Sequence, residues 1–309
     1  MGIWVAAATR LRVLVPVLAV FTQLTACATV PGRELAQIGA LVTPASIDFD
    51  DLYAYAARSK AAYGTGSAIR DSYPGTVHVG APAGTDVQYF LDIDDTRKTQ
   101  IITVRGTVNQ RNWSEDFDTV IRRDRKLDIP VHAGFDTVAS AINADVQPYL
   151  KAGYTTYVTG HSLGGAAAAL LAIYLMEDGV TVKRVVTFGQ PKFTTSTGVK
   201  RLAALPIIRV VDENDIVPLI PPASEVFDPT GPYEHVGPEV ILLEGPRYSY
   251  LQSHDATRIS LGEFWRSLGL ADVKDHKIDK YLSRISEKKA SSLQVAYDVR
   301  ERYVARAVP

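Results

Sequence analysis

The stretch that decides the fold of this chain is Tyr157-Val158-Thr159-Gly160-His161-Ser162-Leu163-Gly164-Gly165-Ala166-Ala167-Ala168. The residues before the glycine, from Thr155 to Thr159, are β-branched or aromatic and are typical of a strand. The residues from Ala166 to Met176 are apolar and strong helix formers. Between them lies a G-x-S-x-G pattern with Ser162 at its centre. The stretch therefore predicts strand, sharp turn and helix.

This turn indicates a serine nucleophile. The turn leaves no room for side chains at its flanking positions, so glycines stand there and the Ser162 hydroxyl is lifted clear of the backbone. The helix that follows directs its free N–H groups at an oxygen that becomes negative during acyl transfer. Chance alone could produce three fixed positions, but the strand before and the helix after make chance a poor explanation.

Composition excludes several other kinds of function. The chain has 309 residues, of which 46% are hydrophobic and 22% charged, and its formal net charge is −1. Such values suit a soluble globular protein large enough for one sizeable core or two small ones, and near-neutral charge gives no reason to expect a nucleic-acid partner. We find no metal-ligand spacing and no phosphate-binding glycine loop, so we expect neither a metal nor another cofactor.

The N-terminal segment predicts export and a lipid anchor. Arg10 and Arg12 precede an apolar run, and Leu24-Thr25-Ala26-Cys27 follows it. This order is that of a secretory signal, and the apolar run is short for a bilayer span. The four residues also resemble the lipobox of bacterial lipoproteins, in which the cysteine carries the lipid. Cys27 is the only cysteine.

We therefore expect a signal peptide at 1–26, a tether at 27–45 and one folded domain at 46–309, held at a membrane through Cys27. Ala28, in place of an aspartate, favours the outer membrane. The alternatives are an ordinary signal peptide and an apolar N-terminal helix with an incidental cysteine. The sequence gives no indication of oligomeric state.

Alternating patterns downstream predict an α/β fold with a mostly parallel central sheet and helices on both faces. Helices are expected at Phe49–Tyr63 and Gly134–Leu150, and a short one at Ile278–Ile285. Paired strands are expected at Val87–Ile93 and Gln100–Val104, and buried strands at Thr181–Phe188 and Ile207–Val211.

A serine needs a base that takes its proton and an acid that orients the base. In the fold that carries this turn, the acid and then the histidine follow the serine in the chain. That order removes His78, His132 and His161, and we expect the His161 side chain to point away from the nucleophile. The acid is Asp215 or Asp212, in the loop after the strand Ile207–Val211.

The oxyanion needs two donors. One is the N–H of Leu163, just after the nucleophile. For the other, Thr107 follows a strand and a glycine that permits close approach.

Taken together, these motifs resemble the class 3 lipases of the α/β-hydrolase fold, the family of the fungal triacylglycerol lipases. The matching segments, in the family's order, are Val104-Arg105-Gly106-Thr107, Arg111-Asn112-Trp113 with Asp116, Val131-His132-Ala133-Gly134-Phe135, the Gly-His-Ser-Leu-Gly-Gly turn, Thr187-Phe188-Gly189-Gln190-Pro191, Asn214-Asp215-Ile216-Val217-Pro218 and Tyr233-Glu234-His235-Val236-Gly237.

The resemblance implies Ser162 as nucleophile, Asp215 as acid and Thr107 as oxyanion residue. It also implies that His132 and His235 are structural, and that the segment from Val108 to about Ile129 takes the place of the family's lid.

Two histidines remain as candidates for the base. The family's histidine is typically followed by an apolar residue and then an aromatic one. His276, followed by Ile278 and Tyr281, fits that pattern better than His254 does. We favour His276 and keep His254 as the alternative base.

The sequence thus predicts a secreted, lipid-anchored serine esterase or lipase that hydrolyses acylglycerols or related lipids through Ser162, His276 and Asp215. One alternative is a phospholipase A1 or lysophospholipase with the same catalytic groups. The other is an envelope lipoprotein without catalytic activity.

Overall fold

The structure is a computed structural model that describes residues 47–107, 120–221, 231–252 and 273–303. The predicted signal peptide, the tether with Cys27, residues 108–119 of the expected lid and His254 lie outside these ranges.

The described chain contains both strands and helices. The strands are β1 (Thr76–Gly80), β2 (Tyr89–Asp94), β3 (Thr99–Val104), β4 (Ile121–Arg123), β5 (Pro130–His132), β6 (Thr155–His161), β7 (Val182–Phe188), β8 (Thr194–Thr195), β9 (Ile207–Asp212), β10 (Tyr233–Glu234), β11 (Glu239–Leu242), β12 (Arg247–Leu251) and β13 (Leu293–Gln294). The α-helices are α2 (Phe49–Ala61), α3 (Gly66–Ser72), α4 (Ala133–Val146), α5 (Leu163–Glu177), α6 (Ser196–Arg201) and α8 (Ile278–Lys289). Short 3₁₀ turns are η2 (Gln147–Tyr149), η3 (Val217–Leu219), η4 (Val273–His276) and η5 (Tyr297–Tyr303).

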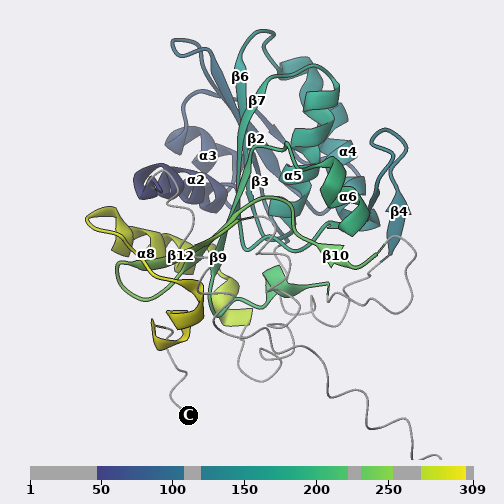
Figure 1. Ribbon diagram of the computed structural model, residues 1–309. Helices are drawn as coiled ribbons and strands as arrows, with labels where there is room; N and C mark the ends of the chain where they lie inside the picture. Colours follow the sequence, from purple (N-terminus) through teal and green to yellow (C-terminus); the bar gives the residue numbers. More distant parts are fainter. Residues whose placement is uncertain (1–46, 108–119, 222–230, 253–272, 304–309) are drawn as a thin grey trace, which may run out of the picture.

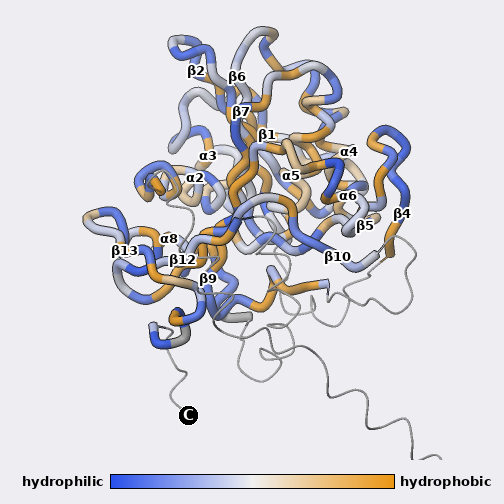
Figure 2. Tube along the Cα trace, in the orientation of Figure 1, coloured by the Kyte–Doolittle hydropathy of each residue, from blue (hydrophilic) through white to orange (hydrophobic). Residues whose placement is uncertain are grey.

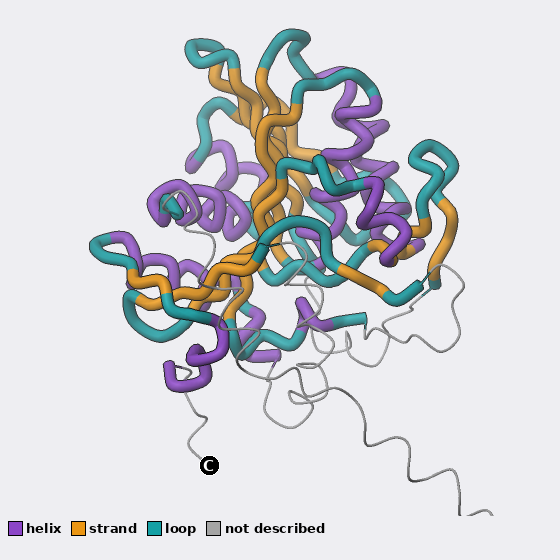
Figure 3. The backbone as a smooth tube through the Cα atoms, viewed as in Figure 1, coloured by secondary structure: helices purple, strands orange, loops and turns teal. Residues whose placement is uncertain are grey.

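Within the described residues, nine strands form one sheet in the order β1-β2-β3-β6-β7-β9-β11-β12-β13. The central strands β3, β6, β7, β9 and β11 run parallel to one another, whereas β1–β2, β2–β3 and β11–β12 pair antiparallel. Helices α2, α3 and α8 lie on one side of this sheet and α4, α5 and α6 on the other (Figures 1 and 3). The predicted fold class, α/β with a mostly parallel sheet, is confirmed.

Two apolar layers hold the helices to the sheet. On the α4–α5 side, α5 is buried around its circumference, as its continuous run of alanine and leucine requires. On the opposite side α2 and α8 pack over β7 and β9 through residues such as Leu52, Phe188 and Tyr281. Figure 2 shows the apolar residues gathered along the central strands and hydrophilic residues at the tip of the β4–β5 hairpin.

Most of the predicted elements are present with small shifts at their ends. Two helices differ most. Helix α4 ends at Val146 and is followed by η2, short of the predicted Leu150, and α8 continues past Ile285 to Lys289. Its extra turn is held by Lys288, whose buried ammonium donates to the carbonyls of Leu243 and Gly245. A small second sheet, β10-β8-β5-β4, was not predicted. Its strands have two or three residues, too few to show a period of two.

None of the described helices combines the length and the hydrophobicity that a membrane crossing would need.

Candidate active site

Ser162 stands at the turn between β6 and α5, in a strained backbone conformation. Its φ is 62° and its ψ is −134°, a region that non-glycine residues rarely occupy. The Ser162 N–H donates to the carbonyl of Phe188 at 2.9 Å, which fixes the turn to the neighbouring strand β7. The side chain is buried, with 1% of its surface exposed. This is the predicted turn.

Gly164 allows the end of β3 to lie directly against the start of α5. A Cβ at this position would lie 2.4 Å from the carbonyl oxygen of Val104, which no real Cβ tolerates. The loop after β3 is thereby brought to Ser162, because a Cβ on Gly106 would lie 2.9 Å from the Ser162 Cβ. Thr107 is the next residue in that loop. Leu163 opens α5, so its N–H has no partner within the helix turn.

Asp215 and His276 meet in a buried pair. The Nδ1 atom of His276 and the Oδ2 atom of Asp215 are 2.7 Å apart, and both side chains are almost fully enclosed. The Tyr281 hydroxyl donates to the same Oδ2 atom at 2.5 Å, and the backbone N–H of Val217 donates to Oδ1 at 2.9 Å. The carboxylate is therefore oriented by three donors from three segments, of which one is the imidazole.

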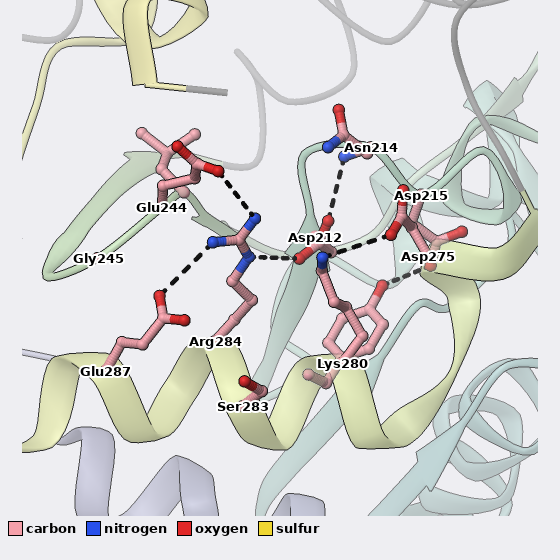
Figure 4. A network of polar contacts seen from close by, with 12 residues as sticks. Asp212, Asn214, Asp215, Glu244, Gly245, Asp275, Lys280, Ser283, Arg284 and Glu287 are labelled. Carbon is pink, nitrogen blue, oxygen red and sulfur yellow. Dashed lines mark hydrogen bonds and ion pairs between the residues drawn. The ribbon is translucent and has the colours of Figure 1, made fainter. Parts of the chain in front are cut away.

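Asp212, the other candidate acid, faces a different partner. Its Oδ2 lies 3.5 Å from the guanidinium of Arg284, which α8 also places near Glu244 and Glu287 (Figure 4). Burial raises the pKa of Asp212 to about 6, against the lowering effect of the Asn214 N–H and of Arg284. Between the two acids, the geometry places Asp215 and not Asp212 at the imidazole.

Because Gly189 has no side chain, Asp215 and His276 can lie directly against its backbone. It follows β7 with a φ of 56°, and a Cβ there would lie 2.8 Å from His276 Cε1 and 2.9 Å from both Asp215 Oδ2 and the Tyr281 hydroxyl. The glycine of the Thr-Phe-Gly-Gln-Pro segment is thus required by close approach as well as by its left-handed conformation.

His161 joins the two halves of the site. It directly precedes Ser162, and its ring stacks on that of His276 with centroids 4.7 Å apart. Its Nε2 lies 2.8 Å from the His276 carbonyl oxygen. Burial, with a smaller contribution from His276, lowers the pKa of His161 well below its ordinary value. His161 is therefore neutral and packs on the second histidine.

His132 and His235 make structural contacts. His132 caps α4, where its Nδ1 accepts from the Phe135 N–H at 3.4 Å, and its ring stacks on Phe135. His235 lies 2.6 Å from the Pro218 carbonyl, in the turn that follows Asp215. These contacts agree with the structural roles that the resemblance implied.

Sequence reasoning did not identify the Tyr281 hydroxyl as a partner of the acid. The sequence marked Tyr281 only as an aromatic side chain that packs. A pattern of residue types carries no signal for the direction of a hydroxyl, so this contact required the structure.

No group of three or more His, Cys, Asp or Glu side chains in the described part of the chain is placed to hold a metal ion. The chemistry that these residues can perform is proton transfer between serine, imidazole and carboxylate.

The chain is similar to known lipases. Residues 101–225 match the family model described as lipase (class 3). A secreted mono- and diacylglycerol lipase of Fusarium solani is 32% identical over 186 residues, which cover 54% of this chain and 52% of that protein. A phospholipase A1-II 6 of Oryza sativa subsp. japonica is 27% identical over 191 residues, 48% of this chain and 45% of that protein.

The chain thus spans about half the length of the curated relatives it matches. The structure of a lipase from Rhizopus microsporus var. chinensis covers 76% of this chain with a TM-score of 0.63 and 24% identity, and the match covers 88% of that chain. This likeness shows the fold, which is that of the fungal lipases.

Proposed function

We propose that this chain is a class 3 lipase that hydrolyses carboxylic esters, with Ser162 as nucleophile, His276 as base and Asp215 as acid. The observation that carries the proposal is the buried 2.7 Å contact between His276 Nδ1 and Asp215 Oδ2. The His276 ring also stacks on His161, the residue that precedes Ser162. A nucleophile turn beside an acid-oriented imidazole is the arrangement that acyl transfer through a serine requires.

In this mechanism His276 removes the Ser162 proton as the hydroxyl oxygen attacks the acyl carbon. Asp215 accepts from Nδ1–H, which holds the tautomer and stabilises the imidazolium. The N–H groups of Leu163 and Thr107 donate to the oxyanion, and each such donor is worth about 10²–10³ in kcat. His276 then returns the proton to the leaving alcohol, and water hydrolyses the acyl-enzyme by the same steps.

The substrate class we favour is acylglycerols or related lipids, because the Fusarium solani relative is named as a mono- and diacylglycerol lipase. The alternative is a phospholipase A1, as the Oryza sativa relative is named. A panel from short p-nitrophenyl esters through diolein and triolein to phosphatidylcholine distinguishes the two. Release of fatty acid from phosphatidylcholine alone would favour the alternative.

Labelling with a fluorophosphonate tests the nucleophile. The wild-type protein is expected to be labelled and Ser162→Ala is not, with turnover reduced by several powers of ten because the catalytic groups act as a unit. An unlabelled wild-type protein would favour the envelope lipoprotein without catalytic activity. A Ser162→Ala variant that keeps a tenth of the activity would refute the assignment.

The choice of base is tested by two alanine variants. His276→Ala is expected to bind substrate and hydrolyse almost none, whereas His254→Ala keeps most of its turnover, because a missing general base abolishes the proton transfer. The opposite result in the two purified variants would transfer the role to His254.

Lipid attachment at Cys27 is proposed from the sequence alone. The lipid chain is what holds such a protein at a membrane, since each buried methylene contributes about 0.8 kcal/mol. Cys27→Ser is expected to move the protein to the soluble fraction or to leave its precursor uncleaved. Normal processing with unchanged membrane fractionation would contradict the anchor.

A further inference from the structure

A continuous series of hydrogen bonds connects the loop after β3 to the backbone of His276. The series begins beside Gly106. Burial raises the pKa of Tyr63, the backbone N–H of Gly106 opposes that rise, and a Cβ on Gly106 would lie 2.6 Å from the Tyr63 hydroxyl oxygen. That hydroxyl lies 2.8 Å from His161 Nδ1, and His161 Nε2 lies 2.8 Å from the carbonyl oxygen of His276. Two side chains, Tyr63 and His161, therefore join the oxyanion loop to the residue that carries the base.

The direction of each hydrogen bond in this series is determined. A carbonyl oxygen can only accept, so His161 Nε2 carries the proton and donates to His276. Because burial keeps His161 neutral, its Nδ1 has no proton and accepts from the Tyr63 hydroxyl. The Tyr63 oxygen is then free to accept from the Gly106 N–H. Replacing either side chain by one that cannot both donate and accept interrupts the series.

Both ends of the series are fixed by further contacts. Tyr63 lies just past the end of α2, and the side-chain amide of Gln88 donates to the carbonyls of Ala62 and Gly64 on either side of it, at 2.9 and 2.8 Å. The Gln88 carbonyl accepts from the Arg105 N–H at 2.8 Å. Tyr63 and the loop that contains Thr107 are thus tied to the same residue, Gln88.

At the other end, His161 touches His276 twice. It bonds the backbone carbonyl and covers one face of the imidazole ring, with the two ring planes 28° apart. These contacts restrict both the position of the His276 backbone and the tilt of its ring, while Asp215 holds Nδ1 from another direction.

We propose that Tyr63 and His161 are positioning residues that set the oxyanion loop and the base relative to each other. The proposal rests on the proposed function, since it assigns no chemistry to either side chain. The oxyanion loop and the base must act on the same tetrahedral intermediate. The loop donates to its oxyanion, and the base exchanges a proton at the nucleophile. A displacement of about 1 Å between such groups costs about 10²-fold in rate.

The central variant is Tyr63→Phe, which removes one hydroxyl and keeps the ring. We expect kcat to fall about tenfold or more with KM within about twofold, because alignment and not substrate binding is lost. The matched control is Tyr174→Phe. Tyr174 also has an enclosed hydroxyl, bonded to Asp124 and Asp136, but lies eleven residues into α5, about 16 Å from Leu163. Tyr174→Phe is expected to lower the melting temperature and leave kcat unchanged.

Two substitutions of His161 test the two hydrogen bonds of its ring separately. His161→Gln keeps a donor near the Nε2 position, and His161→Asn keeps an acceptor near Nδ1. The glutamine variant is expected to retain more activity than the asparagine variant, because it preserves the bond to the base. Tyr63→Phe added to His161→Gln should cause little further loss, since both changes interrupt one series. If Tyr63→Phe does not fold, the two His161 variants carry the same test.

A readout independent of activity is the proton resonance of His276 Nδ1–H, measured by NMR on histidine-labelled protein. Tyr63→Phe is expected to shift this resonance and Tyr174→Phe is not. If the wild-type protein neither hydrolyses esters nor reacts with fluorophosphonate, the proposed function fails, and the resonance alone then decides the positioning role. An unchanged resonance, or in an active enzyme a kcat within twofold of wild type, would overturn the inference.

Discussion

Gly189 places the proposed acid and base directly on the backbone that leaves β7. Its φ is 56°, and the space that a Cβ would need is occupied by His276, Asp215 and Tyr281. A side chain here would have to displace all three groups at once. The conformation alone costs an L-residue about 1–2 kcal/mol, so two separate penalties apply at this position.

Gly189→Ala is therefore expected to lower kcat more than tenfold in addition to destabilising the fold. The matched control is Gly153→Ala. Gly153 has a φ of 76° and no atom within 4 Å of its Cβ position, so it carries the strain without the contact. Gly153→Ala should lose about 1–2 kcal/mol in urea unfolding and keep its turnover, whereas Gly189→Ala should lose more stability than that and also lose turnover. Equal activities in the two variants would refute the contact argument.

At the scale of elements, α8 supports the proposed acid Asp215 and the proposed base His276. Its Tyr281 donates to Asp215. Its Lys280 lies 3.5 Å from Asp275, the residue before His276, and its Arg284 faces Asp212 (Figure 4). The helix itself packs on α2, on the same side of the sheet. One helix thus sets the acid loop and the base together.

Tyr281→Phe removes the hydroxyl group of this α8 residue and keeps the packing of its ring, so the two contributions can be measured separately. The ring remains beside Phe188, and Asp215 keeps two of its three donors. Since the lost hydrogen bond goes to a charged group, we expect a loss of about 1.5–3 kcal/mol in stability and about a tenfold fall in kcat. Ser286→Ala, which removes an exposed hydroxyl from the same helix, should change neither. Calorimetry and ester hydrolysis on both variants provide the measurement.

At the scale of the whole molecule, buried charges give the stability a pH dependence. Lys192 is fully buried, and its ammonium donates to the carbonyls of Leu219 (2.6 Å) and Pro221 (3.1 Å), just after the acid loop. Burial, helped by Arg209, lowers the pKa of Lys192 to about 7. In the unfolded chain a lysine titrates near pH 10.4.

Between about pH 7 and pH 10 the unfolded chain therefore binds a proton at Lys192 that the folded protein has released. The contribution of this group to the free energy of unfolding rises with pH across that window, by about 1.4 kcal/mol per unit, and is lost as the pH falls to about 7. Lys192→Met should remove this rise, whereas Lys183→Met, exposed on β7, should follow the wild type. Urea unfolding at pH 6.5, 8 and 9.5 measures it, and parallel profiles would contradict the burial effect.

The sequence was sufficient for the fold and for the nucleophile turn, because both depend on local patterns. The strand–turn–helix around Ser162 is encoded within twelve residues, and the strand Ile207–Val211 was recognised from its own composition. The choice between Asp212 and Asp215 was not local. Each lies in the same short loop, and only the packing of α8 decides which one faces an imidazole and which one faces Arg284.

The packing of α8 on α2 also has a consequence while the chain is being synthesised. Synthesis proceeds from the amino end, so Ser162 and its turn emerge long before His276 and the helix that supports it. Helix α2, the first helix among the described residues, can pack on α8 only after residues up to Lys289 have been synthesised. If His276 is the base, a partly synthesised chain contains the serine and cannot activate it. The polypeptide is then unable to attack any ester until α8 has folded against α2.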